Sequence, residues 1–179
     1  MKQCNFYKLR LFFYLSITVF LLLIVSCKGS SILYNLPIDV YVGGRHDDSA
    51  VYWKNGEMVT LSTKYSGVTS IAIVGGDVYA SGSILLGPMV QDDYGIPVAG
   101  YWKNGKRIVL GNPKYGPKYG SGAAAIFVFG DDVYVGGYID GPNTSVAGYW
   151  KNGKWMGFNA RGGYSPVRSI VVVPRPAGQ

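Results

Sequence analysis

The stretch Tyr-Trp-Lys-Asn-Gly occurs three times in this chain of 179 residues, at positions 52–56, 101–105 and 149–153. The three copies start 49 and 48 residues apart. A second motif, Asp-Val-Tyr, recurs ahead of each copy, at 39–41, 77–79 and 132–134. Because five identical residues in triplicate are beyond chance, the chain contains an internal repeat. A period of this length is typical of arrays built from one supersecondary unit.

Each repeat is predicted to form four short strands. Apolar first strands at 71–74 and 126–129 lead through the turn dipeptides Gly76-Asp77 and Gly130-Asp131 into the strand that carries Asp-Val-Tyr. The third strand holds Tyr-Trp, and Asn-Gly then predicts a type I′ turn, because both residues tolerate positive φ. The fourth strand follows the turn, at 58–61, 107–110 and 155–158. An antiparallel four-stranded unit of about 45 residues has the size of a β-propeller blade.

The strand patterns favour sheets that are covered on both faces. Val78 and Ala80 alternate with Tyr79, and Val51 and Trp53 alternate with an aromatic residue in the same way. An ordinary half-exposed strand would carry polar residues on one face. Stacked sheets need apolar side chains on both faces, so we expect these Tyr and Trp residues to serve packing between sheets.

The repeat resembles those of bacterial propeller lipoproteins bearing Tyr-Trp-Lys-Asn-Gly units and, more distantly, the kelch-like superfamily. The resemblance covers residues 32–173 and implies an all-β, β-propeller-like domain. It implies no activity. The Asp-box pattern of sialidase-type propellers, Ser-x-Asp-x-Gly-x-Thr-Trp, is absent from the sequence, so no catalytic residues are expected from it.

The repeats do not add up to a closed ring, since propellers typically have four to eight blades. We expect about three blades and the first strand of a fourth, at 168–173, followed by an irregular tail at 174–179. The first repeat has a degraded first strand. The interpretations left open are a truncated copy of a longer propeller without independent activity, an open arc of three blades, and closure by self-association through the open blade edges.

Residues 1–26 are predicted to be a signal peptide with a helical apolar segment. Lys2, Lys8 and Arg10 precede an uncharged run at 11–25, which is shorter than the roughly 20 apolar residues of a membrane-spanning helix. Ile24-Val25-Ser26-Cys27 resembles the lipobox of bacterial lipoproteins. That resemblance implies cleavage before Cys27, which would carry the lipid.

The resemblance to lipoproteins also implies a cellular address. Residues 27–31 would form a lipidated tether, with the repeat domain at 32–173 beyond it. Lys28 is not the Asp associated with inner-membrane retention, so an outer-membrane location is expected, with the membrane contacted through the N-terminal lipid. Either the periplasmic or the surface face fits the sequence.

Charge and composition exclude several classes of function. The chain has 17 basic and 10 acidic residues, a net charge of +7. The signal peptide removes three basic residues, which leaves 14 − 10 = +4, so no nucleic-acid partner is expected. A single His and two Cys, one of them in the signal peptide, cannot supply a multi-histidine metal site or a disulfide scaffold. We expect no metal and no cofactor.

Candidate ligand-binding residues lie in variable loops on one side of the repeats, where binding usually resides on such scaffolds. Loop 111–123 contains Pro-Lys-Tyr-Gly twice in succession, and exposed Tyr beside Lys suits a sugar or an acidic polymer. Loop 84–97 holds acidic and aromatic residues that suit Ca²⁺ or carbohydrate, although the spacing matches no recognised calcium pattern. The candidates are Asp92, Asp93, Tyr94, Lys114, Tyr115, Lys118 and Tyr119.

The sequence therefore predicts a lipid-anchored envelope protein that binds a glycan or a protein without catalysing a reaction. The alternative is an envelope hydrolase or lyase in which His46 acts with Asp92 or Asp93. No Ser or Cys nucleophile motif accompanies His46. The simpler interpretation is that His46 and the acidic residues next to it lie in a surface turn.

Overall fold

The computed structural model describes residues 37–63, 65–86, 95–158, 167–176 and 178. The chain divides into two compact units, Met1–Asp39 and Val40–Gln179, and nearly all described residues belong to the second. The predicted signal peptide with its helix and the lipidated tether lie outside the described residues. Within the described part, no helix is long and apolar enough to cross a membrane.

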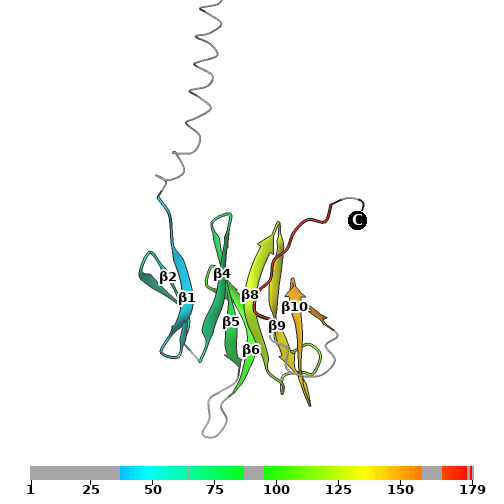
Figure 1. Cartoon of the computed structure of the whole chain (residues 1–179). Coiled ribbons are helices and arrows are strands. Elements are labelled where there is room, and N and C mark those ends of the chain that lie inside the picture. The colour runs from blue at the N-terminus through cyan, green and yellow to red at the C-terminus, as the bar shows by residue number, and fades with distance from the viewer. Residues whose placement is uncertain (1–36, 64, 87–94, 159–166, 177, 179) are drawn as a thin grey trace, which may run out of the picture. The chain divides into compact units, whose positions relative to one another are not determined.

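The described part of the second unit is all β, as predicted, with eleven strands in three antiparallel sheets. The first sheet consists of β1 (Tyr41–His46), β2 (Ser49–Lys54) and β3 (Glu57–Ser62). The second sheet consists of β4 (Gly67–Val74), β5 (Asp77–Leu86), β6 (Ile96–Lys103) and β7 (Lys106–Val109). The third sheet consists of β8 (Ser121–Phe129), β9 (Asp132–Asp140), β10 (Ser145–Lys151) and β11 (Lys154–Gly157). Each sheet is a meander of strands consecutive in sequence (Figure 1).

The second and third repeats form the complete four-stranded unit that the sequence predicts. The first repeat contributes three strands to the described part, consistent with its degraded first strand. The inner strands are longer than predicted, since β5 pairs with β6 as far as Leu86 opposite Ile96. The first turn of the second repeat also differs by one residue: Gly75 and Gly76 form it, and Asp77 already pairs with Val74.

The three Asn-Gly turns have the backbone conformation that the sequence predicts. Asn55, Asn104 and Asn152 have φ angles of 52°, 50° and 49°, and the glycines that follow them have φ angles of 88°, 80° and 81°. Positive φ at both central residues defines the type I′ hairpin, whose twist matches that of the flanking strands. Most other residues would pay about 1–2 kcal/mol to adopt this conformation.

The side chain of each turn asparagine also fastens the hairpin to the neighbouring strand. Its Oδ1 accepts a 2.8 Å hydrogen bond from the backbone N–H of Val40, Val78 or Val133. Its backbone N–H donates a 2.9 Å hydrogen bond to the carbonyl of that same valine. Since these valines are the central residues of Asp-Val-Tyr, the two repeated motifs form one hydrogen-bonded unit.

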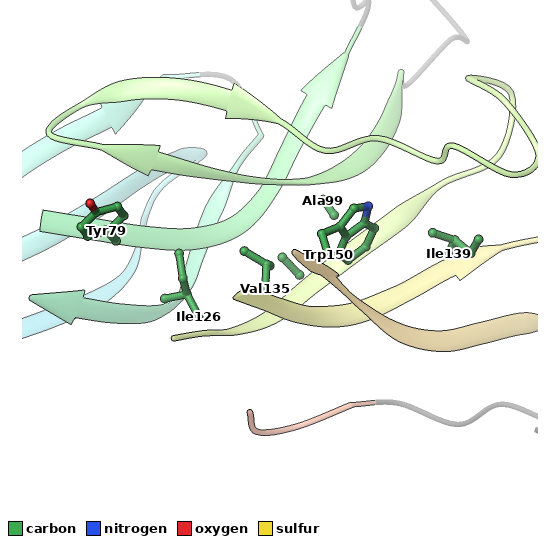
Figure 2. Packing of buried hydrophobic residues seen from close by; sticks show 7 residues of the cluster. Tyr79, Ala99, Ile126, Val135, Ile139 and Trp150 are labelled. Carbon is green, nitrogen blue, oxygen red and sulfur yellow. The ribbon is translucent and has the colours of Figure 1, made fainter. Parts of the chain in front are cut away.

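Apolar side chains from adjacent sheets form two core clusters. One lies between the first and second sheets and includes Ala50, Val68 and Trp102. The other lies between the second and third sheets and includes Tyr79 and Trp150 (Figure 2). The second sheet is thus covered on both faces, and the prediction that its aromatic residues serve packing is confirmed. Trp102 is 1% exposed and Trp150 is 0% exposed.

Direct hydrogen bonds reinforce the junction between the second and third sheets. The hydroxyl of Thr69 in β4 donates to the carbonyl of Ala123 in β8 at 2.9 Å. The backbone N–H of Ile126 in β8 donates to the hydroxyl of Ser70 at 3.3 Å. The antiparallel register of β4 with β5 shifts beside Thr69, and this bulge turns a short polar side chain toward the next sheet.

The C-terminal segment differs from the prediction. Residues 168–173 form no strand, because no strand within the described part lies alongside them to complete a ladder. The segment nevertheless packs against the third sheet (Figure 1). A Cβ atom placed on Gly136 of β9 would lie 2.9 Å from Val167 Cγ1 and 3.4 Å from Ile170 Cβ. The predicted irregular tail begins at Pro174 and likewise contains no strand in its described residues.

The contact of this segment repeats one made earlier in the chain. A Cβ atom placed on Gly43 of β1 would lie 2.5 Å from Val68 Cγ1 and 3.1 Å from the Ile71 side chain of β4. When the repeats are aligned on Asp-Val-Tyr and on the apolar strand, Gly43 corresponds to Gly136, and Val68 and Ile71 correspond to the valine and isoleucine of the C-terminal segment. The segment therefore sits on the third sheet as β4 sits on the first.

Candidate functional site

The loops predicted to share one end of the repeats do lie together where the structure describes them. The β1–β2 turn lies next to the β3–β4 connection, since Ser66 N–H donates to Asp48 O at 3.1 Å. The β9–β10 turn lies next to the β7–β8 connection, because the Tyr115 ring lies against the backbone of Gly141. The structure thus brings two kinds of loop to a common rim.

The β7–β8 connection, Leu110 to Gly120, is held by a buried asparagine at its base. Asn112 is 7% exposed, and its Nδ2 donates to the carbonyls of Asp140 at 2.7 Å and Gly120 at 3.0 Å. Its Oδ1 accepts a 3.0 Å hydrogen bond from the backbone N–H of Tyr115. The loop is therefore a fixed structure tied to the third sheet.

Sequence reasoning missed Asn112 as a positioning residue. The signal that marks it is Asn directly before Pro113, a pair that favours the start of a turn. Ser121 closes the base of the same loop: its hydroxyl donates to Gly111 O and accepts from Ala99 N–H, both at 2.9 Å.

The four loop residues predicted to bind a ligand form one cluster. The Tyr115 and Tyr119 rings meet edge to face, with centroids 5.9 Å apart and planes at 65°. The Lys114 ammonium lies 4.8 Å from the Tyr115 ring centroid, and the Lys118 ammonium lies 5.1 Å from the Tyr119 ring centroid. Each ring thus holds its neighbouring lysine by a cation–π contact. Both lysines are exposed and both tyrosines are half-buried.

A shallow groove of about 360 Å³ extends this cluster across the edge of the third sheet. It is lined by Pro113 and Lys114 of the loop and by Gly153, Lys154 and Trp155 of β11 and its turn. Two ammonium groups and an indole therefore line one depression. This arrangement suits a ligand that combines anionic groups with a flat apolar surface, because the cations attract the charge and the indole offers a stacking face.

Comparison of the chain with known protein families, with curated proteins and with solved structures finds no match.

The remaining predicted site residues are not brought together in the described part. Asp92, Asp93 and Tyr94, and the predicted lipid attachment residue Cys27, lie outside the described residues. His46 is exposed at the end of β1, where the chain turns through Asp47 and Asp48. Across the residues that the structure describes, no group of three or more His, Cys, Asp or Glu side chains is placed to hold a metal.

The aspartates and lysines of the repeated motifs occupy a structural network. Lys103 and Asp77 form a 3.0 Å ion pair in the second sheet, and Lys151 and Asp132 form a 2.7 Å ion pair in the third. In both sheets the turn asparagine donates from Nδ2 to the aspartate Oδ1 at 2.7 Å.

The same two lysines also lie over tyrosine rings. The ammonium of Lys103 is 5.1 Å from the Tyr79 ring centroid, and that of Lys151 is 5.3 Å from the Tyr134 ring centroid. The cations of the repeated motif are thus engaged within their own sheets. Loop residues such as Lys114 and Lys118 make no ion pair within the described part and are the better ligand candidates.

The network shifts the ionisation of its carboxyl groups. Hydrogen bonds from Asn104 and Lys103 lower the pKa of Asp77, and hydrogen bonds from Lys151 and Asn152 lower the pKa of Asp132. A carboxyl whose pKa is lower in the folded state than in the unfolded state stabilises the fold above its unfolded pKa. That contribution is lost as the pH falls through the folded pKa.

We predict that the double substitution Asp77→Asn and Asp132→Asn lowers Tm at pH 7 by no more than about 4 °C, since exposed ion pairs contribute little. The Tm difference from the unsubstituted chain should shrink below about pH 4, where the carboxyls of the unfolded chain begin to protonate, and should vanish once the pH falls below the lowered pKa values of the folded state. Thermal melting by circular dichroism across the pH range measures this. Asp131→Asn, in the adjacent turn, is the control. A Tm difference that stays constant down to pH 2 would contradict the assignment.

Proposed function

We propose that this chain is a lipid-anchored protein of the cell envelope whose propeller-like repeat domain binds acidic glycans without catalysing a reaction. The observation that carries the proposal is the rigid Lys-Tyr loop, held by Asn112 and presenting Lys114 and Lys118 to solvent. The anchor rests on the lipobox at residues 24–27 and on the basic and apolar segments before it.

Stacking of the sheets supports their interpretation as consecutive propeller blades. Each complete sheet is a four-stranded meander, and β4 and β5 of the second sheet contact β8 of the third. Corresponding residues, Trp102 and Trp150, fill the two junctions. Sheets related by a repeated junction of this kind are the building principle of propellers.

Acidic glycans fit the candidate site better than neutral glycans or apolar ligands. The faces of Tyr115 and Tyr119 are each engaged by a lysine, so the ammonium groups are the groups that a ligand meets first. The adjoining groove adds Lys154 and the Trp155 indole. A carboxylated or phosphorylated sugar can pair with the cations while its ring lies on the indole.

The enzymatic alternative has no supporting observation. It requires His46 to act with Asp92 or Asp93, and the two aspartates lie outside the described residues. The described neighbours of His46 include Arg45 and Asp48, which form a 2.6 Å ion pair with each other.

We predict that Lys114→Gln with Lys118→Gln raises the Kd of the full chain for oligogalacturonides at least tenfold, because two of the cations that pair with carboxylates are lost. Neutral maltooligosaccharides should bind weakly to both proteins. Isothermal titration calorimetry at two salt concentrations measures the effect, which should diminish at high salt.

The matched control is Lys106→Gln with Arg107→Gln, which removes the same charge from β7. It should leave the Kd within twofold. Equal losses in the two double variants would contradict a site in the loop, and equal affinity for acidic and neutral oligosaccharides would contradict the ligand class.

We predict that Cys27→Ala abolishes incorporation of an alkynyl palmitate analogue and releases the protein from the outer-membrane fraction, because Cys27 is the proposed acceptor of lipid. Cys4→Ala, within the signal peptide, should change neither result. In-gel fluorescence after click labelling, with fractionation of the envelope, measures both. Persistent labelling of the Cys27→Ala protein would contradict lipidation at this residue.

A further inference from the structure

Two parts of the described structure are incomplete in complementary ways. Among the described residues, the first sheet has no strand in the position that β4 and β8 hold in the other sheets, and no described strand pairs with the outer edge of β1. Residues 167–173 occupy the position of such a first strand, yet no described strand pairs with them. Val171 and Val173 in this segment are each 72% exposed. An exposed, unpaired apolar segment is a template for strand pairing.

A groove of about 540 Å³ lies between this segment and the third sheet. Its lining includes Tyr134 and Tyr149 from the sheet, Phe158 directly after β11, and Ile170 and Val172 from the segment. Most of the lining is aromatic or aliphatic, with Ser169 and Arg175 as its polar members, so the groove suits a large and mainly apolar side chain.

The two internal junctions show what fills the equivalent space. The next sheet inserts a tryptophan there: Trp102 clusters with Ala50 of the first sheet, and Trp150 clusters with Ala99 and Tyr79 of the second (Figure 2). Trp53, the corresponding tryptophan of the first repeat, is only half-buried. The first sheet therefore carries the side chain that the groove lacks.

We propose that the first sheet of a second copy of this chain docks at the C-terminal segment, with its β1 pairing antiparallel to residues 167–173 and its Trp53 entering the groove. The inference rests on the blade interpretation in the proposed function, and it is independent of the glycan. The second copy is the occupant because its first sheet offers both missing parts together, a β1 edge and a tryptophan on the correct face.

The repeats determine the register of this pairing. In the second sheet, Ile71 lies opposite Ala80, and Val74 lies opposite Asp77. Transferred to the proposed junction, Ile170 of one copy lies opposite Val42 of the other. Val173 then lies opposite Asp39, three residues or about 10 Å further along.

The arrangement closes with two copies. Each copy offers one C-terminal segment and one first sheet, so a two-fold axis forms two identical junctions at once, and the second forms at high effective concentration. With three sheets in the described part of each copy, the described parts of the dimer together contain 2 × 3 = 6 four-stranded sheets. A ring of six lies within the range of known propellers.

Disulfide trapping tests the register. Full chains bearing two different tags are co-expressed, one with Val42→Cys and the other with Ile170→Cys, and the membranes are mildly oxidised. Opposed residues of antiparallel strands have Cα atoms about 4.5–5.5 Å apart, which a disulfide bridges. We expect at least tenfold more disulfide-linked heterodimer than from Val42→Cys with Val173→Cys, whose exposed thiol is out of register. Peptide mass spectrometry identifies the linked thiols and excludes Cys4 and Cys27.

Equal heterodimer yields from both pairs would overturn the proposal. So would a single chain that carries both Val42→Cys and Ile170→Cys and forms the disulfide only within itself. A third contradicting result is a monomeric mass for the unsubstituted chain in detergent, measured by sedimentation velocity. A dimeric mass in that last measurement supports it even if a cysteine variant folds poorly. The Lys114→Gln and Lys118→Gln protein should cross-link normally. Failure of glycan binding and failure of dimerisation are therefore separate outcomes.

Discussion

Each sheet depends on the hydrogen bonds between a turn asparagine and the valine of the neighbouring strand. The Asn-Gly pair supplies positive φ at two successive positions, which few other pairs tolerate. The asparagine Oδ1 then binds the N–H of Val40, Val78 or Val133 at a uniform 2.8 Å. One residue thus closes a hairpin and fixes it to a third strand. Because this pairing sets the register of three strands, it determines which side chains reach each face of the sheet.

The packing of sheets follows from that register. It directs Trp102 and Trp150 into the junctions, and it turns Tyr79 toward the third sheet and Ala80 toward the first. Residues of the two repeated motifs make their contacts within the sheets, including the lysines that form ion pairs with Asp77 and Asp132. A scaffold that engages its repeated charges internally leaves recognition to residues outside the repeat. The Lys-Tyr loop above Asn112, where we propose that recognition occurs, lies outside the repeated motifs, and its sequence differs from the corresponding connections of the other repeats.

Local signals in the sequence predict the strands, the type I′ turns and the buried tryptophans, since each depends on neighbouring residues or on strict periodicity. The ends of β5 and β8 are not predictable in this way, because pairing with β6 and β9 extends them through residues that resemble loop. The role of Asn112 is hard to predict from local sequence for a similar reason. Its side chain donates hydrogen bonds to the carbonyls of Gly120 and Asp140, which only the fold brings close to it. The segment at 168–173 has strand composition but no described partner, and composition alone does not form a ladder.

Amide hydrogen exchange at the valines tests most directly whether the asparagine clamp builds each unit. In the full chain, the N–H groups of Val78 and Val133 donate to asparagine Oδ1 in hydrogen bonds that lie near the surface. We expect slow exchange at both positions. Asn104→Ala should speed exchange at Val78 at least tenfold while Val133 stays protected, and Asn152→Ala should do the reverse. Exchange at both valines as fast as in an unstructured peptide, or unaffected by either substitution, would contradict the account.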